Sequence, residues 1–277
     1  DNASDTQARM TVLTSLAALE NFFAPRYKNF RMLGKGGMGL VYRVSDKQLQ
    51  RDVALKVISP LLVEDKEIKR RFLREVRALA ALEHNGIVSV FDFGQTQIPF
   101  YTMELVEGVS LRTLIEQDEL TGKFEEIIKI AQELSEIISY AHEQGVIHRD
   151  IKPANIIMRK EGGIKLIDFG VAAIEGSTTI THSQAVIGTP AFFAPEVVAG
   201  SSTSALSDQY SFGKVLYLLV GGSTAAEAVG TAFLGPPKPL AEVSPNCPKE
   251  LITVIERCMA SKADERFPSM SHVRSHL

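Results

Sequence analysis

The stretch HRDIKPANII, from His148 to Ile157, packs basic, acidic and amide side chains into a short polar segment that then turns apolar. One interpretation is a polar turn between two buried segments, punctuated by proline. The other is a chemical site, in which Asp150 accepts or orients a hydroxyl proton and Lys152 balances the charge of a phosphoryl group. Asn155 would then offer a neutral oxygen to a cation. The rest of the sequence decides between the two.

The chain on either side of this stretch has two different patterns. Between residues 27 and 106, valine, tyrosine and phenylalanine alternate with glycine-containing turns, which predicts a small antiparallel sheet. Residues 64–83 interrupt the strands with apolar residues at helical steps, which predicts one helix. From 107 to 277 the pattern is mainly helical, with a long helix expected over 124–144. The fold class is therefore α+β, and a cleft between such parts is a favoured place for a ligand.

Residues 1–26 precede the strands as a helical extension. An apolar stripe through Leu16 and Leu19 predicts an amphipathic helix over residues 5–23, and Pro25 ends it. We expect this helix to dock on the main domain rather than to bind a partner or lie on a membrane surface. A regulatory role is a further hypothesis, in which its apolar stripe covers the β-rich part near the helix that carries Glu75. A contact with another chain is the alternative.

The composition limits the class of protein. The 277 residues carry a formal net charge of −3, which gives no indication of a general affinity for nucleic acid or anionic membranes. Cys247 and Cys258 are too few for a disulfide framework or a zinc site, and Cys258 fits an apolar helical pattern. No apolar run in this sequence reaches membrane-spanning length. We expect a cytoplasmic location, for a free protein or for the cytoplasmic domain of a membrane-anchored one.

Residues 34–41 read GKGGMGLV and match the pattern G-x-G-x-x-G-x-V. The pattern alone is weak, and a dinucleotide fingerprint needs a helix directly after the glycines. Here LVYRVS follows and predicts a strand. The glycines are therefore expected to form a hairpin whose backbone N–H groups can approach phosphates.

Three further residues have chemistry that fits the same kind of site. Lys56 lies in VALK on a predicted strand, although taken alone it reads as a solvated edge lysine. Glu75 is its candidate partner, and the plainer alternative for Glu75 is a helix pair with Arg71, worth a few tenths of a kcal/mol. Asp168, in DFG, places a carboxylate after a buried strand, where it can bind a hard cation.

These pieces occur in one order: GKGGMGLV, VALK, the helix with Glu75, HRDIKPAN, DFG and APE at Ala194–Glu196. In that order they resemble the protein kinases, and most of all the bacterial Ser/Thr kinases of the eukaryotic type. The resemblance covers residues 27–277, with a β-rich N-lobe over 27–106 and a helical C-lobe over 107–277. It implies a bilobal protein-kinase-like fold and transfer of the ATP γ-phosphoryl group to proteins, with Mg²⁺, or Mn²⁺ in its place, as cofactor.

The resemblance also implies a role for each matching residue. Asp150 is the catalytic base, and Lys152 assists at the γ-phosphate. Lys56 contacts the α- and β-phosphates and pairs with Glu75 in the active state. Asn155 and Asp168 are the metal ligands. The implied nucleotide contacts are Leu33, Gly34, Gly36, Gly37, Gly39, Val41, Ala54, Lys56, Met103, Glu104, Val106 and Ile157.

The implied acceptor is serine or threonine, because Lys152 and Thr189 resemble the residues that Ser/Thr kinases carry at these positions. Arg149 resembles an arginine that often receives a phosphate from the loop after DFG. We expect this loop to be autophosphorylated, with a second copy of the chain as partner. A solvated Ser/Thr-rich loop without a regulatory role is the alternative. The regulatory residues so predicted are Arg149, Thr178, Thr179, Thr181, Ser183 and Thr189.

The resemblance implies a structural role, rather than a catalytic one, for two further charged residues. Asp208 resembles the aspartate that bonds the backbone of the catalytic loop, and Arg266 resembles the partner of Glu196. Both are expected to be buried. Before APE the family often has Tyr-Met, whereas this chain has Phe192 and Phe193, a departure that concerns peptide docking rather than phosphoryl transfer.

Two other functions compete with an active protein kinase. A pseudokinase, or nucleotide-binding signalling scaffold, is disfavoured because the residues expected to bind ATP and transfer phosphate are all present. A small-molecule phosphotransferase is disfavoured because GTPAFFAPE resembles a loop that docks peptides.

Overall fold

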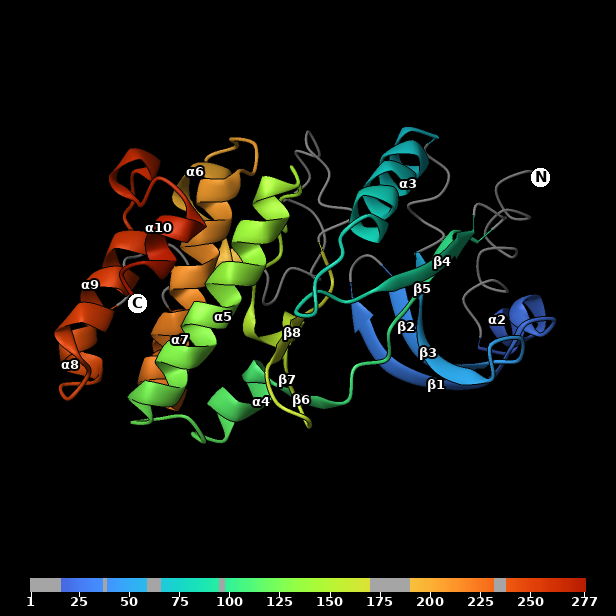
Figure 1. The fold of residues 1–277 in the computed structure, drawn as a ribbon, viewed down its shortest axis with the longest axis horizontal. Helices are drawn as coiled ribbons and strands as arrows, with labels where there is room; N and C mark the ends of the chain where they lie inside the picture. Colours follow the sequence, from blue (N-terminus) through green and yellow to red (C-terminus); the bar gives the residue numbers. More distant parts are fainter. Residues whose placement is uncertain (1–15, 37–38, 59–65, 95–97, 170–189, 232–237) are drawn as a thin grey trace. The chain divides into compact units, whose positions relative to one another are not determined.

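The structure is a computed structural model, and it describes residues 16–36, 39–58, 66–94, 98–169, 190–231 and 238–277 (Figure 1). The chain splits into two compact units. The N-terminal unit comprises Asp1–Glu83 and Ser89–Leu105, and the C-terminal unit comprises His84–Val88 and Val106–Leu277. The main crossover falls where the sequence pattern changes from strands to helices. The short segment 84–88 is an excursion into the C-terminal unit that the pattern did not predict.

A five-stranded sheet with the order β1-β2-β3-β5-β4 forms the centre of the N-terminal unit. All neighbouring strands are antiparallel, as predicted. The strands are β1 (Tyr27–Gly36), β2 (Gly39–Asp46), β3 (Arg51–Ile58), β4 (Val90–Gly94) and β5 (Phe100–Met103). In the described part of this unit, the helices α2 (Leu16–Phe23) and α3 (Lys66–Ala80) accompany the sheet.

One face of this sheet carries Lys56. Residues paired directly across neighbouring strands point to the same side of a sheet, and Lys56 pairs with Val41 and with Tyr101. Helix α3 packs on this face, because the ring of its Phe72 lies 6.1 Å from the ring of Tyr101. The ammonium group of Lys56 lies 5.9 Å from the centre of the same Tyr101 ring.

The opposite face carries an apolar cluster that α2 completes. Leu19 and Phe23 of α2 are only 1% and 4% exposed, and the Phe23 ring meets the Phe100 ring edge to face at 4.9 Å. The helix thus docks on the main domain as expected, but on the face of the small sheet opposite the one that α3 contacts. The part of the expected helix over residues 5–15 lies outside the described residues. The buried cluster comprises Leu19, Phe23, Tyr27, Tyr42, Val44, Val53, Leu55, Val57 and Ile98.

Arg26, directly after α2, connects the helix to two strands. Its guanidinium donates to Asp46 of β2 at 3.2 Å and also to Asp92 of β4. The Lys47 ammonium group donates to the carbonyl of Ala24 at 2.5 Å. Burial on its own acts to raise the pKa of Asp46, but hydrogen bonds from two backbone N–H groups and from Arg26 outweigh it and lower the pKa.

The C-terminal unit is mainly helical, as predicted. The apolar face expected for the long helix α5 is buried, at Ile127, Ile130, Ala131, Leu134 and Ile138. The helices are α4 (Leu111–Glu116), α5 (Phe124–Glu143), α6 (Pro195–Val198), α7 (Ala205–Thr231), α8 (Leu240–Val243), α9 (Lys249–Cys258) and α10 (Met270–Arg274). Short 3₁₀ turns cover Pro153–Asn155, Pro190–Phe192 and Ala263–Glu265.

A small three-stranded sheet frames the HRDIKPAN stretch. It consists of β6 (Gly108–Ser110), β7 (Ile156–Arg159) and β8 (Ile164–Leu166), in that order. The segment 84–88 belongs to this unit because Leu166 donates its N–H to the Gly86 carbonyl at 2.7 Å. The stretch leads into β7, and β8 leads into Asp168, so the hairpin brings the two candidate metal-binding positions to the same end of the sheet.

Helix α7 continues past Gly222, although the backbone of that residue is not helical. Gly222 has φ +56° and ψ −144°, and a Cβ there would lie 2.2 Å from Oδ1 of Asp118. Helical turns resume at Ser223, whose N–H and hydroxyl both donate to the Asp118 carboxylate at 2.8 Å. A residue 105 positions away therefore caps the second half of the helix.

Both cysteines are free and buried, as predicted for Cys258. Burial raises the pKa of the Cys258 thiol to about 12 and that of Cys247 to about 11. Both thiols stay protonated and act as small apolar side chains. Within the described ranges, every helix is too short or too polar to span a membrane.

Candidate active site

The HRDIKPAN stretch holds the carboxylate of Asp150 between two donors. Lys152 Nζ donates to Oδ2 of Asp150 at 2.7 Å, and Asn155 Nδ2 donates to the same oxygen at 3.0 Å. Asn155 also donates to the Asp150 carbonyl at 2.8 Å, which fixes the turn. The Asp150 side chain is 18% exposed, so solvent or a substrate group can reach it. The structure thus places these three predicted residues together.

Buried His148 connects this loop to the residues around Asp168. The N–H of Asp150 donates to Nδ1 of His148 at 3.2 Å, so Nε2 carries the proton and donates to the Ile167 carbonyl at 3.1 Å. The His148 ring packs on Phe169, with centroids 4.4 Å apart. Burial lowers the pKa of His148, which favours this neutral form.

Asp168 lies close to the same loop through its backbone. The N–H of Ile167 donates to the Asn155 carbonyl at 2.9 Å. Asp168 itself has φ +55°, and Arg149, beside Asp150, has φ +68°. A left-handed conformation at residues other than glycine costs about 1–3 kcal/mol, and such residues cluster at functional sites.

Asp208 of α7 fixes the backbone of the loop, as predicted. Its Oδ1 accepts the N–H of Arg149 at 2.9 Å, and its Oδ2 accepts the N–H of His148 at 2.8 Å. His142 Nε2 lies 2.9 Å from Oδ2, so a third donor orients the carboxylate, which is 1% exposed. Sequence reasoning missed His142. It lies at the end of an amphipathic helix, and no local signal distinguishes it from a solvated histidine.

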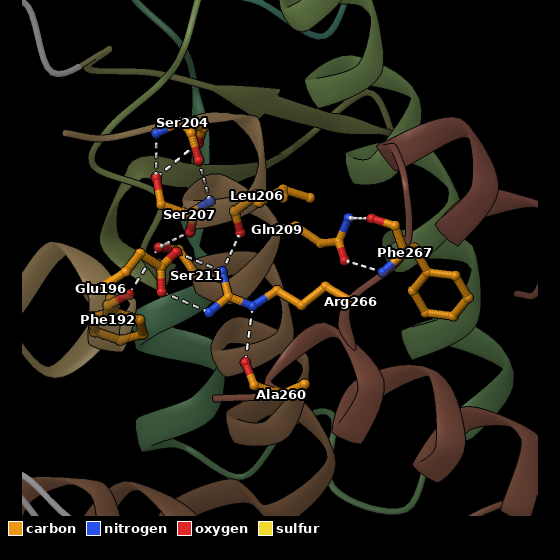
Figure 2. A network of polar contacts seen from close by, with 10 residues as sticks. All are labelled: Phe192, Glu196, Ser204, Leu206, Ser207, Gln209, Ser211, Ala260, Arg266 and Phe267. Atoms are coloured by element: carbon orange, nitrogen blue, oxygen red, sulfur yellow. Dashed lines mark hydrogen bonds and ion pairs between the residues drawn. The ribbon is translucent and has the colours of Figure 1, made fainter. Parts of the chain in front are cut away.

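The predicted pair of Arg266 and Glu196 is confirmed (Figure 2). The two Nη atoms of Arg266 donate to the two carboxylate oxygens of Glu196 at 2.7 and 2.8 Å. Arg266 also donates to the carbonyls of Ala260 and Leu206, each at 2.9 Å. Burial acts to raise the pKa of Glu196, but the hydrogen bonds from Arg266 outweigh it and lower the pKa. Four of the five N–H groups of this buried guanidinium thus have an acceptor.

The segment before APE is anchored on α7. The hydroxyl of Ser211 donates to the carbonyl of Phe192 at 2.8 Å (Figure 2). Next to it, the side-chain amide of Gln209 exchanges two hydrogen bonds with the backbone of Phe267, at 2.9 and 3.0 Å. The position of the Phe192 backbone is therefore set by α7.

In the N-terminal unit, the glycines form the expected hairpin. Gly36 pairs with Gly39, and Gly34 pairs with Val41. Gly39 has φ +148°, and a Cβ there would lie 1.9 Å from the carbonyl oxygen of Val57. Glycine is required at this position to pair β2 closely with β3, apart from any contact with a ligand.

Lys56 is buried, with 7% exposed, so the interpretation as a solvated edge lysine is wrong. The reason is that β3 lies between β2 and β5 rather than at an edge. Val41 pairs with Lys56, and Met103 pairs with Ala54, so these four predicted nucleotide contacts share one face of the sheet.

The remaining predicted residues are spread over both units. Leu33 lies on β1 and is 51% exposed, and Glu104 follows β5 and donates its N–H to the Ser89 carbonyl at 2.9 Å. Val106 and Ile157 belong to the C-terminal unit, with Ile157 on β7. Glu75 lies on α3. The predictions for the side chain of Glu75 and for Gly37, Thr178, Thr179, Thr181, Ser183 and Thr189 lie outside the described residues.

The oxygen donors of the C-terminal unit fit a hard cation. Among the described residues, no group of three or more His, Cys, Asp or Glu side chains can hold a metal by itself. Asn155 uses its Nδ2 toward Asp150, which leaves Oδ1 as an acceptor, and Asp168 adds a carboxylate. Mg²⁺ is commonly held by one or two such protein oxygens, with phosphates and waters completing the shell.

Known proteins give a consistent comparison. The family described as protein kinase domain matches residues 27–277. The serine/threonine-protein kinase PknB of Mycolicibacterium smegmatis is 35% identical over 269 residues, which cover 91% of this chain and 42% of that protein. PknB of Mycobacterium leprae is 34% identical over 264 residues, with the same coverage. The crystal structure of the PknI kinase domain of Mycobacterium tuberculosis is 29% identical, with a TM-score of 0.71, and the match covers 90% of this chain and 95% of that one.

The match agrees with the order of the motifs and with the division into a β-rich N-terminal unit and a helical C-terminal unit. It begins at Tyr27, the first residue of β1, so α2 lies outside the matched region. The chain spans 42% of the length of these two curated relatives. From its fold, its motifs and this match, the chain belongs to the protein kinase domain family, among relatives that include bacterial serine/threonine kinases.

Proposed function

We propose that this chain is an active serine/threonine protein kinase, which transfers the γ-phosphoryl group of ATP to hydroxyl groups of proteins. The observation that carries the proposal is the Asp150 carboxylate, which Lys152 and Asn155 hold and which stays partly exposed. Membership of the protein kinase domain family supports the same conclusion.

In the C-terminal unit, Asp150 is the proposed base. A carboxylate within hydrogen-bond reach of the acceptor hydroxyl orients it and accepts its proton. Lys152, 2.7 Å from Asp150, neutralises charge on the transferred group. Asn155 and Asp168 are the proposed ligands of Mg²⁺ or Mn²⁺, which neutralises phosphate charge when bound.

In the N-terminal unit, Lys56 is the proposed contact of the α- and β-phosphates, with Glu75 as its partner. Its buried position on a central strand supports this role, because a lysine held in one place costs less entropy on binding than a solvated one. The glycines of the β1–β2 hairpin supply backbone N–H groups. The remaining proposed nucleotide contacts are Leu33, Val41, Ala54, Met103, Glu104, Val106 and Ile157.

The acceptor is proposed to be serine or threonine, on the strength of Lys152 and Thr189. The loop after DFG is proposed to be autophosphorylated by a second copy at Thr178, Thr179, Thr181 or Ser183, with Arg149 as the phosphate ligand. We further propose that the catalytic domain spans 27–277, with 1–26 as an extension. The proposed location is the cytoplasm, which supplies ATP and keeps the two free thiols reduced.

The test is transfer of labelled phosphate from ATP to the chain itself and to a generic basic protein. Asp150→Asn is expected to lower the rate by about 10²- to 10⁴-fold, because general-base catalysis is lost, and to keep nucleotide binding. Asp168→Asn is expected to weaken nucleotide binding that depends on Mg²⁺. Asp264→Asn, an exposed aspartate far along the chain, is the matched control and keeps the wild-type rate.

Two outcomes would contradict the proposal. Equal incorporation by the wild type and Asp150→Asn would remove Asp150 from its role. Binding of ATP without transfer to any protein by the wild type would indicate a pseudokinase or a nucleotide-binding scaffold.

A further inference from the structure

Lys214 is a buried cation of α7 that the proposed phosphoryl transfer does not use. It is 5% exposed. Among the described residues, no carboxylate or other hydrogen-bond acceptor pairs with it, and its Nζ lies 5.9 Å from the centre of the Tyr210 ring. Burial lowers the pKa of Lys214. A buried ammonium group is unfavourable unless an anion or a set of acceptors compensates it.

Arg266 provides the contrast within the same region. Its guanidinium lies 5.1 Å from the centre of the same Tyr210 ring, and both oxygens of Glu196 bind it. Two cations therefore border one aromatic ring. Arg266 has its anion within the described part of the chain, whereas Lys214 does not, so one positive charge beside Tyr210 is unbalanced there.

Lys214 lies on the side of α7 that carries the segment before APE. Residues three or four positions apart are neighbours on a helix surface. Ser211, three positions earlier, holds the Phe192 carbonyl at 2.8 Å (Figure 2). Tyr217, three positions later, donates its hydroxyl to the Lys238 carbonyl at 3.1 Å. Lys214 thus lies between the attachment points of two segments, and the first of these is the one expected to dock a peptide.

We propose that Lys214 is a specificity-determining residue that binds an acidic side chain of the protein substrate. The inference rests on the proposed kinase function and names its substrate class, which is a segment with Asp or Glu near the acceptor hydroxyl. The carboxylate supplies the charge that the ammonium lacks, in a desolvated place where such a bond is strong. A basic side chain in the same place is rejected by the uncompensated lysine.

The test uses pairs of serine peptides that differ by Glu against Gln at one flanking position at a time. The wild type is expected to show about a tenfold higher kcat/KM for the Glu peptide at one of these positions, since a charge-assisted hydrogen bond is gained. Lys214→Met is expected to lose this ratio, and Lys214→Arg to retain most of it. Methionine is close to lysine in length and suits a buried place, so the variant is expected to fold.

The matched control is Lys249→Met, an exposed lysine of α9, which keeps the wild-type ratio. A wild type with equal kcat/KM for all pairs overturns the inference, and so does a Lys214→Met variant that keeps the preference. In both cases transfer to peptides still occurs, so the kinase function stands. A wild type that transfers phosphate to no peptide and not to itself overturns both proposals.

A pairing within the chain is tested separately. Glu175 and Glu227 are the acids of the C-terminal unit whose side chains lie outside the described residues. Their Gln variants are compared by thermal unfolding, alone and combined with Lys214→Met. Additive shifts in Tm support a substrate anion, whereas a non-additive shift with either acid assigns Lys214 an internal partner and overturns the inference.

Discussion

The two units hold their candidate site residues by different physical means. In the N-terminal unit, strand register and apolar packing on both faces of the sheet fix Lys56. In the C-terminal unit, the buried carboxylate of Asp208 holds the backbone beside Asp150, and the buried guanidinium of Arg266 anchors the APE segment. Apolar packing is spread over many contacts, so its loss is graded. Loss of one partner from a buried charged pair leaves the other uncompensated.

The largest expected effect tests the charged arrangement. Arg266→Met should lower the free energy of unfolding by about 3–5 kcal/mol, because Glu196 and two backbone carbonyls lose their donor. Urea denaturation measures the loss. The double variant Arg266→Met with Glu196→Gln should lose less than the single one, since the uncompensated carboxylate is gone. Losses that simply add would show that the two side chains act independently.

The next effect tests the apolar arrangement. Phe23→Ala should lower the free energy of unfolding by about 3 kcal/mol, because it opens a cavity between α2 and the face of the sheet opposite α3. The same urea experiment measures it. Leu16→Ala, at the exposed first residue of the same helix, is the control and should change stability by no more than about 0.5 kcal/mol. Equal effects at the two positions would mean that α2 does not pack as described.

The smallest expected effect is the pH dependence of stability that comes from His148, a buried group that is neutral rather than charged. The pKa of His148 is lowered from the usual 6.5, so below that pH the unfolded chain binds a proton that the folded chain resists. The stability from His148 is therefore complete above pH 6.5 and falls as the pH drops, by at most about 1.4 kcal/mol per pH unit. Urea denaturation at a series of pH values should show a shallower slope for His148→Phe than for the wild type. His272→Gln, at an exposed histidine, should keep the wild-type slope.

Sequence patterns predicted most of the fold and many of the site contacts, for reasons visible in single residues. The apolar period of α5 and the strand pattern around Lys56 are local signals, and the structure bears out both. The continuation of α7 past Gly222 depends on a cap from Asp118, which no local pattern carries. The same holds for His142 at the end of α5. Its role depends on its contact with Asp208 of α7, which is distant in sequence.

Lys56 shows a second limit of prediction from sequence patterns. Its neighbours in sequence give a strand, but only the order of the strands shows that β3 is central and that the lysine is buried. Strand order depends on contacts between distant segments, and residue periodicity does not encode it. The resemblance to kinases predicted a phosphate contact for Lys56, but not the order of the strands.

Helix α2 shows that the region matched by the family and the region that folds as a unit have different boundaries. The stretch shared by descent begins at Tyr27, but the stretch that folds together begins at least as early as Leu16. A fragment that begins at Tyr27 would expose the apolar face of the sheet to water. Proteins with large exposed apolar patches tend to aggregate. Fusion partners and purification tags are therefore best joined upstream of α2.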